Sequence, residues 1–173
     1  ALPISDTKLI GLHPFGTQFR LDESTAAFSG FGGPKAMVES SEGGANMLMG
    51  IGINTGGYNY RAVGVKWMAN ADSYMNDVKF VGGHGGLWKP KPGVEEPRGR
   101  WNRPARISSP DNPVAASGMD LAWDNQYWSL WVTNNGGGTF KDIWTASTYA
   151  TNGFYANNTS TPGRIYAMSI EHH

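Results

Sequence analysis

Acidic side chains beside the expected strands are the first residues of this sequence that could do chemistry. Asp142 lies in the segment Phe140-Lys-Asp-Ile-Trp144, and Glu171 lies between Ile170 and two histidines. Cleavage of a glycosidic bond needs one protonated and one ionised carboxyl group on opposite sides of the bond, so both residues are candidates for acid–base catalysis. Asp142 and Asp77 occupy the same place in two similar segments, which also fits aspartates that accept backbone hydrogen bonds at turns. Glu171 equally fits a carboxylate that faces solvent.

His84 is the third candidate for catalysis, because glycines surround it in Gly82-Gly-His-Gly-Gly86. Glycines allow a sharp turn and the close approach of a ligand, so His84 is expected to bind or orient one. The alternative is a ring that packs over a neighbouring strand. His172, next to Glu171, is a candidate substrate-binding residue. Neighbouring side chains on a strand point to opposite faces, so His172 and His173 cannot both join one site, and we expect no metal centre.

Residues 83–118 are expected to form a long surface loop, because six prolines interrupt any strand pattern there. Trp88, Trp101 and Arg103 of this loop are candidate substrate-binding residues, since an exposed indole can stack on a pyranose ring and arginine can bond hydroxyl or carboxylate groups. The tryptophans could instead pin the loop to the rest of the chain. A basic, aromatic loop also suits single-stranded nucleic acid, but the net charge of zero disfavours such a partner.

The composition points to a folded all-β domain. Among 173 residues there are 24 glycines, 21 aromatic residues (7 Trp, 7 Tyr and 7 Phe) and no cysteine. Many glycines without a collagen-like period imply many turns, and aromatic and β-branched runs favour strands. The absence of cysteine excludes disulfides, thiolate metal sites and a cysteine nucleophile. No apolar run approaches the roughly 18 residues of a membrane span, so we expect no membrane association.

Short alternating or β-branched runs predict strands, and clusters of Gly, Asn and Pro predict the turns between them. The expected strands cover residues 7–12, 36–38, 47–53, 61–67, part of 73–86, 119–123, 127–132, 139–144, 153–156 and 164–172. No linker interrupts this series. We therefore expect residues 1–173 to form one domain.

A repeat relates several of these strands. Ile51 and Val78 are 78 − 51 = 27 positions apart, and Ile143 and Ile170 are 170 − 143 = 27 positions apart. A period in the twenties is typical of a parallel β-helix, in which short strands from successive repeats stack around one interior. The interval from Val78 to Ile143 is 143 − 78 = 65, so at least one connection must contain an insertion, which we place at residues 83–118.

Two segments resemble a known family. Residues 61–85, with the run Asp-Val-Lys-Phe-Val-Gly-Gly-His, and residues 134–173, with Phe-Lys-Asp-Ile-Trp and the final Ser-Ile-Glu-His-His, are similar to pectate-lyase-like β-helix proteins related to family 55 glycoside hydrolases. The resemblance implies a right-handed parallel β-helix, a secreted microbial origin, and inverting exo-cleavage of β-1,3-glucan without a metal or cofactor. Since the family's general acid is a glutamate, it makes Glu171 the nearest candidate. Members of the family have two β-helical halves, so the implied partner is the remainder of a longer chain or a second half.

Three functions follow as hypotheses. The first is a glycoside hydrolase, secreted and without cofactor, that acts on a β-1,3-glucan-type polysaccharide. The second is a non-catalytic β-helical module of an adhesin, tail spike or cell envelope that holds glycan. The third is a calcium-assisted polysaccharide lyase, which would need several carboxylates gathered on one face.

Overall fold

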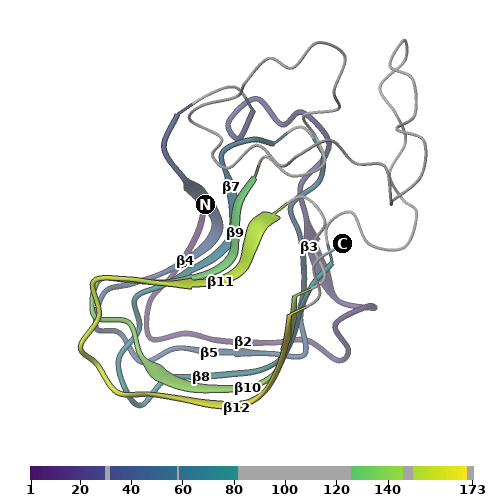
Figure 1. Ribbon diagram of the computed structural model, residues 1–173. Helices are drawn as coiled ribbons and strands as arrows, with labels where there is room; N and C mark the ends of the chain where they lie inside the picture. Colours follow the sequence, from purple (N-terminus) through teal and green to yellow (C-terminus); the bar gives the residue numbers. More distant parts are fainter. Residues whose placement is uncertain (30–31, 58, 82–125, 146–149, 171–173) are drawn as a thin grey trace, which may run out of the picture.

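The computed structural model describes residues 1–29, 32–57, 59–81, 126–145 and 150–170 (Figure 1). These residues form strands joined by turns, and no helix occurs among them. None of the described segments is therefore a helix that could cross a membrane. The strands are β1 (Leu2–Ile4), β2 (Lys8–Ile10), β3 (Gln18–Arg20), β4 (Lys35–Ser40), β5 (Met47–Met49), β6 (Gly52–Asn54), β7 (Ala62–Trp67), β8 (Tyr74–Phe80), β9 (Gln126–Val132), β10 (Gly138–Thr145), β11 (Ala150–Ala156) and β12 (Gly163–Ile170).

The strands lie in two sheets. The first has five strands in the order β1-β4-β7-β9-β11, and the second has seven, with the path β12-β10-β8-β5-β2 and with β6 between β3 and β8. Every strand pairing in both sheets is parallel. In Figure 1 the strands of each sheet lie behind one another, and the chain passes from one sheet to the other and back. The prediction of an all-β chain with parallel strands is confirmed.

The strand register agrees with the first of the two predicted spacings. Gly52 pairs with Lys79, and the backbone N–H of Lys79 donates to the carbonyl of Ile51, which places Ile51 beside Val78. Val78 pairs directly with Ile143. The 65-residue interval thus separates two adjacent strands, and it exceeds the 27-residue spacing by 65 − 27 = 38 residues. The predicted insertion, residues 83–118, lies outside the described residues.

The second predicted spacing is wrong by two residues. Ile143 pairs with Met168, and Ile170 pairs with Thr145. The interval from Ile143 to its partner is therefore 168 − 143 = 25 residues. Residues two apart on a strand face the same side, so the hydrophobic pattern could not distinguish Met168 from Ile170.

Most other expected strands are present, with three differences. The run 47–53 forms two strands, β5 and β6, separated by Gly50 and Ile51. Strands β1 and β3 were not predicted, since three residues give too short a pattern. The expected strand 119–123 lies outside the described residues.

A left-handed backbone conformation, with positive φ, occurs at the same register position in four neighbouring strands or strand ends. Gly50, Asp77, Asp142 and Ala167 have φ values of 65°, 48°, 50° and 56°, and the register aligns them across β5, β8, β10 and β12. A Cβ atom on Gly50 would collide with the carbonyl oxygen of Gly11, so glycine is required there. Aspartate adopts this conformation more readily than most residues, which gives Asp77 and Asp142 a structural role.

The core lies between the two sheets and consists of stacked apolar residues. Leu48 of β5 pairs with Met75 of β8, and Met75 pairs with Phe140 of β10. All three residues are buried. Trp67 is the largest fully buried side chain among the described residues. Its indole N–H donates to the carbonyl of Gly137 at 2.9 Å, and its ring meets Phe140 edge to face. At the outer edge of the second sheet, Ile165 of β12 pairs with Phe140 but is 52% exposed.

We predict that Ala167→Gly raises the free energy of unfolding by about 0.5–1 kcal/mol. A left-handed conformation costs an L-residue roughly 1–2 kcal/mol, and glycine removes this strain. The greater conformational freedom of glycine in the unfolded chain offsets only part of the stability gained. Urea denaturation monitored by circular dichroism measures the change. The control is Ala156→Gly on β11, exposed like Ala167 but without a positive φ, which should lower stability. Equal effects of the two substitutions would contradict the assigned strain.

Candidate functional site

Four aromatic side chains gather on the first sheet. Tyr127, Trp128 and Trp131 come from β9, and Tyr155 comes from the neighbouring strand β11. The rings of Trp128 and Tyr155 are stacked, with centroids 4.2 Å apart and planes at 22°. The centroid of Trp128 is also 4.8 Å from that of Trp131 and 5.3 Å from that of Tyr127. We call these four residues the aromatic cluster.

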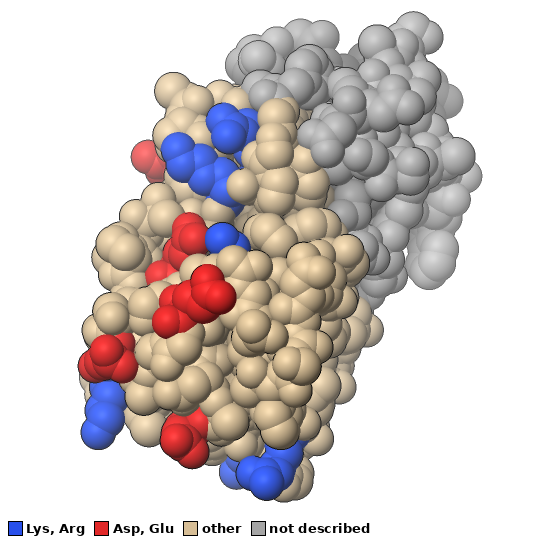
Figure 2. Space-filling view, turned by 90° about the vertical axis from the view of Figure 1, so that its left-hand side faces the viewer, with Lys and Arg blue, Asp and Glu red and all other residues tan. Residues whose placement is uncertain are grey.

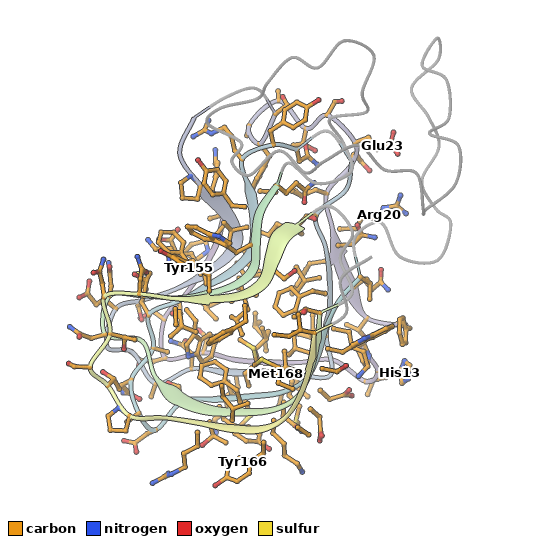
Figure 3. The ribbon with its side chains drawn as sticks, in the orientation of Figure 1. His13, Arg20, Glu23, Tyr155, Tyr166 and Met168 are labelled. Atoms are coloured by element: carbon orange, nitrogen blue, oxygen red, sulfur yellow. The ribbon has the colours of Figure 1, made fainter. Side chains whose placement is uncertain are left out.

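The aromatic cluster lies on the outer side of the sheet. Leu130 and Val132 of β9 belong to the core between the sheets, so Trp131 between them points outward. In Figure 3, Tyr155 lies on the side of β11 that faces away from Met168, which projects into the space between β11 and β12. The cluster is therefore separate from the core.

A small apolar layer supports the cluster. Tyr127 packs with Ala36 and Val63, and all three are buried, while Trp128 and Trp131 pack against them and remain partly exposed. The hydroxyl group of Tyr127 donates to the carbonyl of Gly32 at 3.0 Å. This hydrogen bond and the packing below fix the position of the rings.

Polar groups border the aromatic cluster on two sides. The Lys66 ammonium lies 2.8 Å from a carboxylate oxygen of Glu39 and 5.3 Å from the ring centroid of Trp131, close enough for an ion pair and a cation–π contact. On the other side, the indole N–H of Trp131 donates to Oδ1 of Asn157 at 2.8 Å. Trp131 is thus held from both sides.

Figure 2 shows the side of the molecule that is on the left in Figure 1, where Tyr155 lies in Figure 3. Acidic side chains gather near the middle of this face, basic ones lie above and below them, and a broad area beside the acidic group has no charge. The face offers both charged groups and an uncharged area to a ligand.

Asp142 is the one predicted site residue among those that the structure describes. Glu171, His84, Trp88, Trp101, Arg103 and His172 lie outside the described residues. Asp142 is exposed, and its carboxylate is 3.8 Å from the ammonium of Lys141. Since β10 belongs to the second sheet, Asp142 and the aromatic cluster lie on different sheets.

A shallow depression lies beside Asp142. Lys79, Asp142 and Ser169 supply its polar groups, and Ile143, Ala167 and Met168 complete it. Asp77, which the register aligns with Asp142 on the adjacent strand, is 3.2 Å from the ammonium of Lys79. The depression therefore has one carboxylate, one ammonium and one hydroxyl group in its lining, and the carboxylate of Asp77 lies beside it through its contact with Lys79. No group of three or more side chains suited to hold a metal occurs in the part of the chain that the structure describes.

Sequence reasoning missed the aromatic cluster. Trp128 and Trp131 are three residues apart, and strict alternation would place them on opposite faces of a strand. The structure brings the two rings together because β9 departs from alternation, with two buried residues, Ser129 and Leu130, between the tryptophans. One signal was available, since Trp131 lies between two core residues and must point away from them.

Comparisons of this chain with protein-family models, with curated proteins and with solved structures found no match.

We predict that Lys66→Met lowers the free energy of unfolding by about 1 kcal/mol. The substitution removes the ion pair with Glu39 and the cation–π contact with Trp131, two interactions of about 0.5–1 kcal/mol each at such sites. Urea denaturation measures the loss. The matched control is Lys141→Met, whose partner Asp142 is 3.8 Å away and half exposed, and which should change stability by less than about 0.5 kcal/mol. Equal losses in the two variants would show that Lys66 does not stabilise the aromatic cluster.

Proposed function

We propose that this chain is a carbohydrate-active segment of a right-handed parallel β-helix, and that it binds a β-1,3-glucan-type polysaccharide on the aromatic cluster. The β-helix is supported by the repeated passage of the chain between two parallel sheets and by the in-register pairing of equivalent strands. The handedness and the type of glucan rest on the resemblance to β-helical glycoside hydrolases. Secretion follows from the same resemblance and stays a prediction.

The observation behind the binding function is the aromatic cluster with its polar border. Aromatic rings offer flat apolar faces, and the C–H face of a pyranose ring packs well on such a surface. Sites for small polar ligands combine apolar walls with a few fixed hydrogen-bonding groups. Asn157, Glu39 and Lys66 can supply such groups to sugar hydroxyls beside Trp131 and Tyr155. This combination supports a sugar ligand better than a purely apolar one.

We predict that Trp131→Ala and Tyr155→Ala each weaken laminarin binding about tenfold, because loss of one aromatic contact costs on the order of 1.5 kcal/mol. Isothermal titration calorimetry or affinity electrophoresis measures the change. The control is Tyr166→Ala on β12, which should leave laminarin binding unchanged. Tyr166 is 55% exposed, and in Figure 3 it points outward from the second sheet, away from Tyr155. Circular dichroism spectra establish that each variant is folded.

Unaltered binding in both cluster variants, or an equal loss in Tyr166→Ala, would refute the assignment of the binding surface. No binding by the unaltered protein to laminarin or other neutral glucans would refute the proposed function itself.

Hydrolysis is the second candidate function. Asp77 and Asp142 lie at aligned positions on adjacent parallel strands, which are about 4.8 Å apart. Two carboxylates on one surface can in principle act as acid and base on a glycosidic bond. The left-handed conformation of both residues gives each a structural explanation as well. The resemblance adds Glu171 as the candidate general acid and His84 as a residue that orients the substrate.

We predict that Glu171→Gln abolishes the release of reducing sugar from laminarin while laminarin binding persists, since glutamine keeps the shape of the side chain and cannot give up a proton. Asp142→Asn is the comparison variant, because asparagine tolerates the left-handed conformation and stability should hold. Loss of turnover in Asp142→Asn would assign Asp142 to catalysis, and full turnover would leave it with the structural role alone. Binding without hydrolysis by the unaltered protein would favour the non-catalytic module.

The implied second β-helical half, or remainder of a longer chain, is part of this proposal. Ile165 and Ile170 on the edge strand β12 are each 52% exposed, and a further parallel strand from such a partner would cover them. The lyase hypothesis gains no support from the described residues, in which no cluster of metal-binding carboxylates occurs.

A further inference from the structure

One row of side chains crosses the first sheet from strand to strand. Glu39 of β4 pairs with Lys66 of β7, Lys66 pairs with Trp131 of β9, and Trp131 pairs with Tyr155 of β11. Four neighbouring strands thus contribute one residue each at the same register. We call these four residues the cross-strand row.

The cross-strand row has the dimensions of a short oligosaccharide. Neighbouring strands are about 4.8 Å apart, so three intervals give a length of about 14 Å from Glu39 to Tyr155. The spacing between strands is close to the length of one hexopyranose unit. Successive units of a chain that lies along the row can therefore meet successive side chains.

The chemistry of the row changes along its length. Trp131 and Tyr155 form an aromatic end, and both rings are partly exposed. Glu39 and Lys66 form a polar end, with side chains that are 35% and 21% exposed. Because their charges neutralise each other at 2.8 Å, this end offers hydrogen-bonding groups without a net charge. Such an end suits the hydroxyl groups of a neutral sugar better than the carboxylate of an acidic one.

The alternative path, along strand β9, is blocked at one end. Tyr127 is only 6% exposed, and the ring of Trp128 has Tyr127, Trp131 and Tyr155 as neighbours within 5.3 Å. A sugar unit that followed β9 from Trp131 would meet the partly exposed Trp128, whose ring is in contact with three others, and then the buried Tyr127. The path across the strands leads instead to the partly exposed polar groups of Lys66 and Glu39 and continues to the exposed Pro3 of β1.

We propose that the bound polysaccharide runs across the strands along the cross-strand row, with one part of the chain on Trp131 and Tyr155 and the next units hydrogen-bonded to Lys66 and Glu39. This inference rests on the proposed glucan-binding function and specifies the direction of the ligand and its subsites. The aromatic end provides most of the affinity, and the polar end adds affinity only for ligands long enough to reach it.

The test uses β-1,3-linked gluco-oligosaccharides of increasing length, from the disaccharide to the hexasaccharide, titrated calorimetrically into the full chain. We expect affinity to rise with length until the ligand spans the row of about 14 Å, and then to level off. The double variant Glu39→Ala with Lys66→Ala removes both partners of the ion pair. It should weaken disaccharide binding only slightly, through the lost contact of Lys66 with Trp131. It should lose the gain for longer ligands, about three- to tenfold, as expected for one lost hydrogen bond. Tyr155→Ala should weaken binding at every length.

A matched control tests the direction of the ligand. Lys35 lies at the start of β4, with its ammonium 5.3 Å from the ring centroid of Phe28, and it does not belong to the row. Lys35→Ala should leave the length dependence unchanged. Loss of the length dependence in Lys35→Ala but not in the double variant would overturn the proposed direction. Binding that does not depend on length would overturn this inference and leave the proposed function intact, whereas no binding at any length would overturn both.

Discussion

In-register pairing of parallel strands is the constraint on which the rest of this structure depends. Each strand forms hydrogen bonds with its neighbour in the sheet, so paired residues lie beside one another about 4.8 Å apart. Leu48, Met75 and Phe140 follow one another in this way, and each is buried by its neighbours. A polar side chain at such a position would be buried against apolar groups on both sides without a hydrogen-bonding partner. The apolar pattern of one strand therefore restricts the pattern of its neighbour.

The same pairing produces a different result on the outer side of the sheets. Outward positions also lie in rows, but no core requires them to be apolar. In the cross-strand row the side chain changes from carboxylate to ammonium to indole to phenol over four strands. Backbone pairing fixes the spacing of these groups, while the sequence remains free to choose their chemistry. A surface of this kind can match a polymer that also repeats its units at regular intervals.

Features that depend on a pattern within one strand were predicted from the sequence better than features that depend on the register between strands. Composition and alternation within single strands were sufficient for the all-β fold. The parallel strands were predicted from the 27-residue spacing, and its Ile51–Val78 instance agrees with the observed register. The register of β12 was wrong because a shift of two residues leaves the pattern unchanged. Asp142 was singled out because it occupies the same place as Asp77 in a similar segment. Both residues have a left-handed conformation, which the sequence does not reveal and which gives a structural reason for aspartate at the two positions.

The candidate site was harder to predict, because it depends on contacts between distant segments. The stack of Trp128 on Tyr155 joins residues 155 − 128 = 27 positions apart. The contact of Lys66 with Trp131 joins residues 131 − 66 = 65 positions apart. The second contact requires the length of the insertion to be known before any register can be assigned. The other predicted site residues lie outside the described residues, so their assignment still rests on sequence alone.

Rigidity is the property that makes the aromatic cluster suited to binding. Exposed aromatic surface lowers solubility and is uncommon on proteins unless it serves recognition. Here Trp131 is fixed by Asn157 on one side and by Lys66 on the other, and Tyr127 is fixed by the carbonyl of Gly32. Side chains that are already ordered lose little conformational entropy when a ligand arrives, so more of the contact energy appears as affinity. The sheet thus holds these rings in place on the side that faces away from the core.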